Sequence, residues 1–407
     1  MKVLHVIASV DPRGGGPIEG VFKSAQVWSS HGHDVQIASL DSPDAEWVIS
    51  SPVKTIALGS PTRSQSRLRK LLPWVRYGYT PRFPQWLRAN AANFDVVIVN
   101  GLWNYTSLST SRALRRLNLP YFVFTHGMLD PWFNKAYPVK HFLKALFWKL
   151  FEHKVLRDAR GVLFTCEEER RMARQSFAPY IAREYVVGYG TTDVSGDPGE
   201  QVAAFFSEVP KATGRRIALF LSRIDEKKGI DLLLTAFARH ADTFPDLDLV
   251  IAGPDLAGIQ KSLMDLSSNL GIAARVHWPG MLTGAAKWGA FRAAEFFVLP
   301  SHQENFGVVV AEAMALSRPV LITNKVNIWR EVELDGAGIV VDDNAEAIAA
   351  GLQEMCSLSP SQRGEIGRKG RLGFLNRYNL EDNAMQLLSL LDRLSARAPL
   401  ELSNKAR

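Results

Sequence analysis

Short apolar runs alternate along the whole chain with segments in which hydrophobic residues recur at helical spacing. This alternation is typical of βαβ units built around a parallel sheet. The pattern predicts six strands in the first half, at residues 3–8, 35–39, 53–58, 96–100, 121–125 and 161–165. It predicts six more in the second half, at residues 216–222, 247–252, 275–277, 296–300, 319–323 and 338–341. The sequence therefore favours an α/β fold with two doubly wound, Rossmann-like parallel sheets.

The chain of 407 residues is longer than one hydrophobic core usually supports, so two domains are expected. Turn-forming residues are dense between Gly190 and Gly214 and apolar periodicity is weak there, which favours a connection in this segment. We therefore expect an N-terminal domain over residues 1–195, a C-terminal domain over residues 196–379 and a last helix over residues 380–396. Such sheets bind ligands beyond the carboxyl ends of their strands, so two domains facing each other would enclose a cleft.

Composition narrows the class of protein. A hydrophobic content of 46% and a charged content of 22% are ordinary for globular proteins. The two cysteines, Cys166 and Cys356, have no spacing that suits a disulfide framework or a thiolate zinc site, which favours the cytoplasm. Residues 1–10 predict a first strand, because Asp11-Pro12-Arg13 and three glycines follow where a targeting segment would need a small-residue cleavage site. No apolar stretch reaches the roughly 18 to 20 residues that cross a bilayer.

Phosphate-binding chemistry is indicated where the first strand of each half ends. Gly14-Gly15-Gly16 separate the first strand from a helical pattern, and glycines before a helix N-terminus let backbone amides approach an anion. The alternative for this segment is a flexible loop, because its spacing matches neither the dinucleotide fingerprint nor a P-loop. In the second half, Arg223 and Lys228 follow the strand and precede a helix. Together they would neutralise a diphosphate, the alternative being a solvated basic turn paired with Asp225 or Glu226.

Two glutamates follow a later strand, in the segment Glu304-Asn-Phe-Gly-Val-Val-Val-Ala-Glu312. Glu304 is in a polar loop, and Phe306-Gly307 opens an apolar helix that brings Glu312 to a similar side two turns later. Glu304 is suited to sugar hydroxyls and Glu312 to a ribose diol, with the amides near Asn305, Phe306 and Gly307 left for phosphates. A helix-terminal charge is the alternative for Glu304, whereas Glu312 lies among apolar residues and would need a buried partner.

These motifs resemble the two signature regions of the retaining family-4 (group 1) glycosyltransferases, which have the GT-B architecture. The glycine loop at 14–16 and Thr125-His126-Gly127 at another strand end also fall where that family has its own. The resemblance implies that Arg223 and Lys228 hold the donor diphosphate, that Glu304 contacts the donor sugar and that Glu312 contacts the ribose. It also places His126 beside the anomeric carbon. A neutral imidazole there would donate to a sugar hydroxyl or to the oxygens around the developing positive centre, the alternative being a structural histidine at a strand end. No metal or other cofactor is expected, because the cations replace it.

The charge is distributed unevenly between the two halves. Residues 1–190 carry 25 Lys and Arg against 14 Asp and Glu, a net +11, whereas the remainder is −4. No acidic residue lies between Glu46 and Asp95, where cations and aromatic residues are interleaved: Lys54, Arg63, Arg67, Arg69, Lys70, Trp74, Arg76, Tyr77, Tyr79, Arg82, Phe83, Trp86 and Arg88. Residues 141–155 form an amphipathic helical pattern in which His141, Lys144 and Lys149 adjoin large apolar residues. Both stretches suit an anionic membrane surface, the alternative being an ordinary packed helix with a solvated basic face.

The sequence thus predicts a retaining hexosyltransferase that uses a donor of the GDP-mannose or UDP-glucose type. The expected acceptor is a saccharide or a polyprenyl-diphosphate-linked saccharide in exopolysaccharide or lipopolysaccharide assembly, with the enzyme peripheral on the inner face of the cytoplasmic membrane. A nucleotide-sugar epimerase of the same architecture is one alternative. A nucleic-acid-binding protein is another, although it leaves the paired glutamates unexplained, and no nucleic-acid partner is expected. An oxidoreductase is disfavoured because no Gly-x-Gly-x-x-Gly follows a strand.

Overall fold

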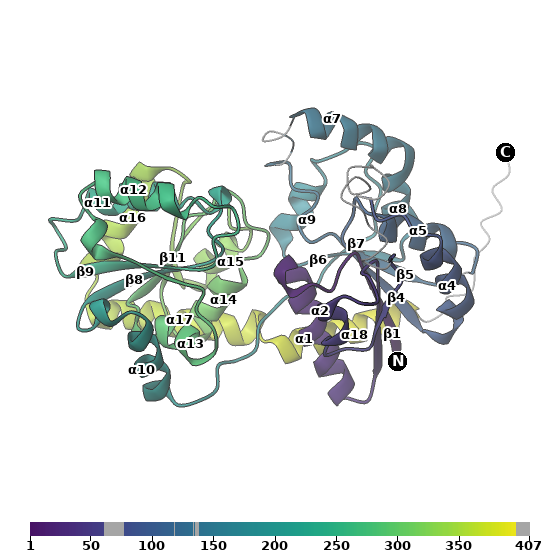
Figure 1. Cartoon of the computed structure of the whole chain (residues 1–407), viewed down its shortest axis with the longest axis horizontal. Helices are drawn as coiled ribbons and strands as arrows, with labels where there is room; N and C mark the ends of the chain where they lie inside the picture. The colour runs from purple at the N-terminus through teal and green to yellow at the C-terminus, as the bar shows by residue number, and fades with distance from the viewer. Residues whose placement is uncertain (61–76, 118, 133, 135–137, 396–407) are drawn as a thin grey trace. The chain divides into compact units, whose positions relative to one another are not determined.

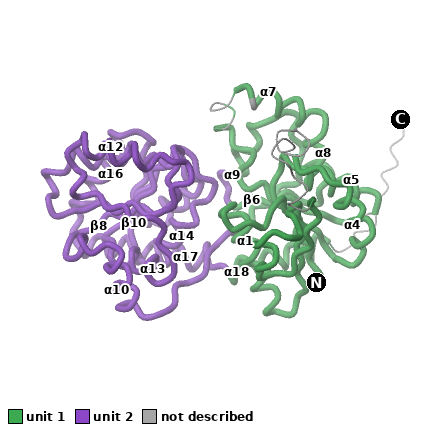
Figure 2. The backbone as a smooth tube through the Cα atoms, in the orientation of Figure 1, with its two compact units in different colours: residues 1–165, 169–188, 381–407 green, residues 166–168, 189–380 purple. Residues whose placement is uncertain are grey.

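The structure, a computed structural model, describes residues 1–60, 77–117, 119–132, 134 and 138–395. The chain forms two compact units (Figure 2). Unit 1 comprises Met1–Thr165, Glu169–Gly188 and the described residues from Glu381, and unit 2 comprises Cys166–Glu168 and Tyr189–Leu380. No helix in these described ranges combines the length and apolar character needed to span a membrane.

Unit 1 is built on a seven-stranded parallel sheet with the order β3-β2-β1-β4-β5-β6-β7. The strands are β1 (Lys2–Ile7), β2 (Asp34–Ser39), β3 (Thr55–Ala57), β4 (Val96–Asn100), β5 (Tyr121–Phe124), β6 (Gly161–Phe164) and β7 (Glu184–Val186). Alternate residues of β1 face different cores, since Val3 and Ile7 pack in one and Leu4 and Val6 in the other. Burial on both faces explains why the central strands are almost purely apolar.

Helices cover both faces of this sheet (Figure 1). One core is formed with α4 (Arg82–Asn90), α5 (Tyr105–Leu114) and α8 (His153–Asp158), and the other with α1 (Gly16–Ser30) and α18 (Leu380–Ser395). The remaining helical segments are η1 (Pro12–Gly14), α2 (Glu46–Ile49), η4 (Ala91–Asn93), α7 (Pro138–Phe147), the π-helical η5 (Trp148–Glu152) and α9 (Glu167–Ala173). The last helix therefore packs beside the first, and the indole of Trp28 donates to the Ala384 carbonyl at 2.7 Å.

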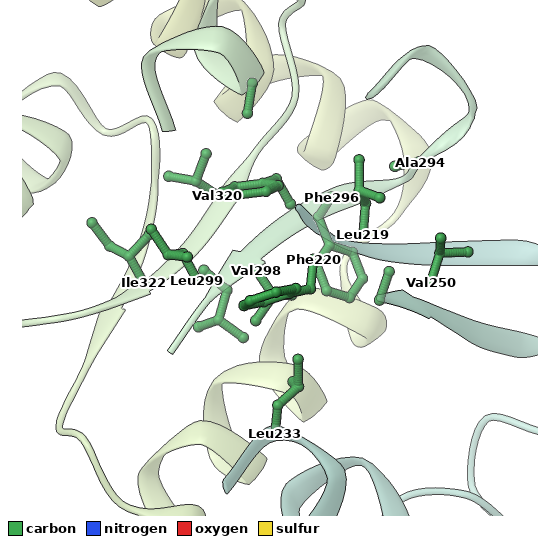
Figure 3. Close-up of a cluster of buried hydrophobic side chains, with 14 of the residues drawn as sticks. Leu219, Phe220, Leu233, Val250, Ala294, Phe296, Val298, Leu299, Val320 and Ile322 are labelled. Carbon is green, nitrogen blue, oxygen red and sulfur yellow. The ribbon is translucent and has the colours of Figure 1, made fainter. Parts of the chain in front are cut away.

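Unit 2 has a six-stranded parallel sheet with the order β10-β9-β8-β11-β12-β13. The strands are β8 (Arg216–Leu221), β9 (Leu247–Ala252), β10 (Val276–Gly280), β11 (Phe296–Leu299), β12 (Val320–Thr323) and β13 (Gly338–Val341). Figure 3 shows part of its core, where Phe296 and Val298 of β11 lie among Leu219, Phe220 and Val320 of the neighbouring strands. The sheet is thus buried on both faces, as expected for a doubly wound fold.

Short helical segments fill the connections of unit 2, and the longer ones cover the sheet. They are α10 (Pro198–Glu208), η6 (Pro210–Ala212), η7 (Glu226–Lys228), α11 (Ile230–Ala238), α12 (Gln260–Asn269), η8 (Ala273–Arg275), α13 (Gly284–Ala293), α14 (Val308–Ala315), α15 (Trp329–Asp335), α16 (Ala345–Ser357) and α17 (Pro360–Arg377). The loops that follow β8, β11 and β12 meet at one edge of the sheet and position the candidate site described below.

Three features of individual elements were not expected from the sequence. The segment between Gly190 and Gly214, in which the connection was expected, contains α10, whose Asp197 side chain caps the helix by accepting from the Glu200 amide at 2.8 Å. The short edge strand β7 was not predicted. The helix expected over residues 141–155 is interrupted by a π-helical turn, η5.

The interleaved basic and aromatic segment is only partly surface. Arg63, Arg67, Arg69, Lys70, Trp74 and Arg76 lie outside the described residues. Phe83 is fully buried, and Trp86 packs against the same core of unit 1. The aromatic residues of α4 therefore stabilise the domain, which is the ordinary role of an apolar helix face.

Candidate active site

The loop after β8 brings Arg223 and Lys228 to the carboxyl edge of the unit 2 sheet. Asp225 caps the one-turn η7 by accepting from the Lys227 amide at 3.0 Å. Gly229 then takes a left-handed conformation with φ 63°, and a Cβ there would lie 2.2 Å from the Pro300 carbonyl oxygen. Only glycine fits this approach, so the loop is packed tightly onto the segment that follows β11.

Lys228 and Glu304 form a buried ion pair at this edge. The Lys228 side chain is 7% exposed, and its ammonium donates to Oε2 of Glu304, which is 21% exposed. The main chain of Glu304 is fixed as well, since its amide donates to the Lys325 carbonyl at 3.0 Å and its carbonyl accepts from the Asn327 amide at 3.0 Å. Because a buried ammonium without a partner is costly, the contact with Glu304 stabilises Lys228.

Arg223 adds an exposed cation to this pair. It makes no hydrogen bond or ion pair with any other residue that the structure describes. Its charge nevertheless reaches the η7 turn: burial lowers the pKa of Lys227, Asp225 opposes this effect, and the positive charges of Lys228 and Arg223 lower the pKa further. The three cations therefore lie close enough to repel one another, an arrangement that favours a polyanionic ligand.

The N-terminus of α14 adjoins the same pair. Gly307 is its N-cap residue, with φ 77° and no side-chain cap, and Glu304 Cγ would lie 3.4 Å from a Cβ placed on Gly307. Phe306 is buried between the rings of Tyr189 and Tyr378, at centroid distances of 5.3 and 5.5 Å. This packing holds the Asn305-Phe306-Gly307 turn, so that the N-terminus of α14 lies close to the side chain of Glu304.

Glu312 has the buried partner that its apolar surroundings require. The carboxylate is 4% exposed, and its Oε1 accepts from Lys287 Nζ at 2.7 Å. Its Oε2 is buried and has no hydrogen-bond partner within the described chain. Lys287 comes from the middle of α13, where nothing in the sequence pattern singled it out. Glu312 thus keeps one acceptor oxygen for a ligand hydroxyl, although no contact links it directly to the Lys228–Glu304 pair in the described residues.

The glycine loop of unit 1 is open. Gly15 has φ 82°, and a Cβ on Gly14, Gly15 or Gly16 would meet no atom within 4 Å. Packing therefore does not require three glycines, which leaves room for a ligand to approach the N-terminus of α1. Asp41 anchors the start of the loop, because its carboxylate accepts from the Val10 amide at 2.7 Å and from the Ser9 hydroxyl at 2.6 Å.

His126 lies at the end of β5 in a conformation uncommon for a residue with a side chain, with φ 48°. Its Nε2 is 3.1 Å from Oδ1 of Asn100, the last residue of β4. The Asn100 amide nitrogen faces the carbonyls of Val6 and Ile98, at 3.4 and 3.3 Å, so Oδ1 is the atom that faces His126. His126 therefore carries its proton on Nε2 and presents Nδ1 as an acceptor, which is the reverse of the donor role expected from the sequence.

The imidazole of His126 is neutral at physiological pH. Burial lowers the pKa of His126 to about 4. Its neighbour His5 is buried as well. Burial, together with repulsion from the positive charge that a protonated His126 would carry, lowers the pKa of His5 to about 3. His5 accepts from the Asn100 amide, with a distance of 3.1 Å between the two nitrogens. A neutral His5 and an oriented Asn100 thus fix one tautomer of His126.

Glu169 of α9 holds the turn on which His126 lies. Its Oε1 accepts from the Thr125 hydroxyl and the Gly127 amide, both at 2.7 Å. Its Oε2 accepts from the amide and the hydroxyl of Thr165, at 2.8 and 2.7 Å. Sequence reasoning missed Glu169, which lies in an acidic run that looks like a solvated surface, and missed Asn100, whose signal was a polar residue that ends a purely apolar strand.

Comparisons with known proteins decide the family. A model described as "Glycosyl transferases group 1" matches residues 202–397, and one described as "Glycosyl transferase 4-like domain" matches residues 15–190. The chain belongs to the group 1 glycosyltransferases. The two matches include Gly15 and Gly16 of the glycine loop, His126, the Lys228 turn and both glutamates, which confirms the resemblance inferred from those motifs.

This glycosyltransferase aligns with relatives over part of their length. It is 31% identical over 228 residues to a D-inositol 3-phosphate glycosyltransferase of Gordonia bronchialis, covering 54% of this chain and 50% of the relative. It is 28% identical over 235 residues to a phosphatidyl-myo-inositol mannosyltransferase of Mycolicibacterium smegmatis, covering 56% of this chain and 58% of the relative. The chain thus spans about half the length of the relatives it matches.

Solved structures share the fold of the whole glycosyltransferase. Sucrose-phosphate synthase of Thermosynechococcus elongatus superposes with a TM-score of 0.77 at 19% identity, covering 98% of this chain and 100% of that one. HepE of Anabaena, in complex with UDP and glucose, superposes with a TM-score of 0.73 at 17% identity, covering 96% and 99%. The two parallel sheets and these neighbours establish the GT-B fold class predicted from the sequence.

Proposed function

We propose that this protein transfers a hexose from a nucleotide-diphosphate sugar to a saccharide or lipid-linked saccharide acceptor, with retention at the anomeric carbon. The observation that carries the proposal is the buried Lys228–Glu304 pair, which lies beside the N-terminus of α14. Cell-surface polysaccharide assembly is the process in which we place the reaction.

The donor diphosphate binds to Lys228 and Arg223 in this proposal. Arg223 supplies a planar fork and Lys228 a compact charge, so they neutralise the pyrophosphate from two directions. When the donor arrives, its phosphate shares the Lys228 ammonium, and Glu304 becomes free to accept from sugar hydroxyls. The amides at Asn305, Phe306 and Gly307 add donors where the α14 dipole favours negative charge.

Glu312 holds the ribose. Its Oε2 is buried without a hydrogen-bond partner in the described chain, and a ribose hydroxyl would satisfy it. Lys287 orients the carboxylate through its contact with Oε1 at 2.7 Å. Sugar recognition by Glu304, which precedes α14, is thus separate from nucleoside recognition by Glu312, which lies within α14.

In unit 1 we assign Gly15 and Gly16 to the donor phosphates and His126 to the transferred sugar. Nδ1 of His126 accepts a hydrogen bond from a sugar hydroxyl, because Nε2 carries the proton and donates it to Oδ1 of Asn100. The acceptor oxygen attacks on the face from which the phosphate leaves: the anomeric C–O bond to phosphate breaks, the new C–O bond forms, and the acceptor proton passes to the departing phosphate oxygen. The cations stabilise the developing charge, and we expect no metal or other cofactor.

The donor is of the GDP-mannose or UDP-glucose type. One relative is named a mannosyltransferase, and a protein of the same fold was crystallised with UDP and glucose. The basic character of residues 1–190 favours an acceptor presented at an anionic surface of the cytoplasmic membrane.

Two measurements test the proposal. Thermal shift reports binding to a panel of GDP- and UDP-sugars, and product analysis then identifies what is formed from the donor that binds. Lys228→Ala should reduce kcat/KM for the preferred donor by on the order of 10³-fold, because an oriented charge at the diphosphate is lost. Lys261→Ala, at an exposed lysine of α12, is the matched control and should leave turnover unchanged.

Three outcomes would overturn the proposal. The first is a Lys228→Ala protein that folds normally and consumes donor at the wild-type rate. The second is an epimerised nucleotide sugar formed from donor alone, which would show an epimerase. The third is salt-dependent nucleic-acid binding without affinity for any nucleotide sugar.

A further inference from the structure

One helix of unit 1 exposes a continuous apolar face. Val139, Phe142, Leu143, Leu146 and Leu150, here called the apolar face of α7 and η5, are each between 48 and 77% exposed. Their positions follow the i, i+3, i+4, i+7, i+11 spacing of one helix side. They are five of the sixteen exposed large apolar side chains in the described chain, and the others are dispersed over both units.

The opposite side of the same helix is fixed to the domain. Trp148 is fully buried, and its indole donates to the Pro179 carbonyl at 2.8 Å. The ring of His141 stacks on Phe177 at 5.0 Å. Lys144 Nζ lies 4.6 Å from the centre of the Trp103 ring. The helix therefore cannot rotate to bury its apolar face, and Figure 1 shows α7 at the rim of unit 1.

Positive charge accompanies the apolar face. The segment between Asp130 and Glu152 contains four lysines and no acidic residue, and Glu152 itself is fully buried. Lys149 lies next to Leu150 and is exposed, and Lys154 follows on α8 with an exposed side chain. Arg157 is exposed too, but it pairs with Asp158 at 2.7 Å, so within the described chain the two lysines supply the unpaired charge. Two copies of this chain docked through the face would bring like charges together, whereas negatively charged headgroups would complement them.

We propose that the apolar face of α7 and η5 inserts into the headgroup region of an anionic lipid bilayer and holds unit 1 on the membrane. The five apolar side chains enter the boundary between headgroups and acyl chains, while the flanking lysines contact lipid phosphates. This docking does not depend on the transfer reaction, so it can be tested without a substrate.

Vesicle co-sedimentation of the full chain tests the proposal. The protein should pellet with phosphatidylcholine vesicles that contain phosphatidylglycerol, and much less with phosphatidylcholine alone. The triple variant Phe142→Ser, Leu143→Ser, Leu146→Ser should lose roughly tenfold or more in partition, because the inserted area is removed. These side chains are exposed, so the fold should survive. The matched control Leu372→Ser, Leu375→Ser, at two exposed leucines of α17, should bind as the wild type does.

A tryptophan placed on the face reports insertion directly. Because the chain has ten native tryptophans, the wild-type spectrum is subtracted. The difference emission of Phe142→Trp should shift to the blue on addition of anionic vesicles, and that of Leu372→Trp should not. Equal binding of the triple variant and the wild type would overturn the proposal. Equal binding to neutral and anionic vesicles would overturn it as well. So would light scattering that finds a dimeric wild type and a monomeric triple variant whose vesicle binding is unchanged, because the face would then join two copies of the chain.

Discussion

At the scale of single residues, unit 1 uses buried polar groups to present one imidazole nitrogen. Asn100 fixes the tautomer of His126, and Glu169 fixes the backbone on both sides of it, through Thr125 and Gly127. A left-handed non-glycine residue persists only when its surroundings hold it. The strained turn is thus maintained by a carboxylate that accepts four hydrogen bonds, and not by the local sequence.

Glu169→Gln should slow turnover without weakening nucleotide binding. A glutamine can accept at only one of its two terminal atoms, so two of the donors that face Glu169 would meet an amide N–H. The His126 turn would shift, and a displacement of about 1 Å costs on the order of a hundredfold in rate. We expect kcat to fall by roughly 10- to 100-fold with little change in the donor KM.

The readout that separates positioning from folding is the imidazole itself. The NMR signals of His126 should move in Glu169→Gln, whereas Glu208→Gln, at an exposed glutamate of α10, should leave both the signals and kcat unchanged. An unchanged kcat with intact folding would show that the turn is held without Glu169.

At the scale of elements, the π-helical turn η5 lies between α7 and α8 in the chain and forms hydrogen bonds to the segment after β4. It brings Glu152 inward, where Oε1 accepts from the Ser107 hydroxyl at 2.6 Å and from the Trp103 amide at 3.1 Å. Trp103 has φ 66°, a second left-handed non-glycine residue at the carboxyl edge of this sheet. A π-bulge thus supplies the buried carboxyl that a regular helix would have directed elsewhere.

Glu152 should make stability depend on pH. Burial raises the pKa of Glu152 from 4.5 to about 7 in the folded protein. Between these values the folded state holds a proton that the unfolded state has released, so the free energy of unfolding falls as pH rises. Relative to Glu152→Gln, the wild type should lose on the order of 3 kcal/mol from pH 4.5 to pH 7, and no more above that.

Urea unfolding of both proteins across this range gives the difference directly. Glu354→Gln, at an exposed position of α16, controls for the loss of one carboxyl group. If the wild-type and Glu152→Gln curves ran parallel, Glu152 would be ionised throughout and its burial would be offset in some other way.

Periodicity and strand ends predicted most elements because each depends on local pattern. Strands β4, β9 and β13 were predicted to the residue, since each is a short, largely apolar run bounded by turn signals. Helix α10 was missed because its Asp197-Pro198-Gly199 start is also a turn signal. The π turn could not be predicted, because residues 148–152 have an uninterrupted helical pattern and the bulge depends on burying Glu152.

The site was predictable where its chemistry lies at strand ends, and not where it depends on long-range pairing. Lys228 and Glu304 are 76 positions apart, yet each follows a strand of the same sheet, and motif spacing brought them together. Lys287 and Glu169 belong to helices with no marker of their own. Lys287 has its role because it contacts the buried carboxylate of Glu312, and Glu169 has its role because it accepts from Thr125 and Gly127. A single sequence does not show which distant residues form such pairs.

At the scale of the whole molecule, the last described helix belongs to the same unit as the first strand. Helix α18 contributes Ala384, Leu387, Leu388 and Leu391 to the core that also contains Trp28 of α1. Helix α18 is thus part of the N-terminal fold, and that fold is incomplete until α18 is made. Unit 1, which has the basic excess and the apolar face of α7 and η5, therefore depends on residues beyond position 380.

Leu391→Ala should destabilise unit 1 and leave unit 2 protected. Leu391 is fully buried, and removing its side chain should cost about 2–5 kcal/mol through lost transfer energy and the cavity left behind. Hydrogen exchange should rise in β1, β2 and α1, which share its core, and stay low in β8 and β9. Ser389→Ala, exposed on the same helix, is the control and should change neither. Faster exchange in β8 and β9 with unchanged protection of β1 would mean that α18 stabilises the other unit instead.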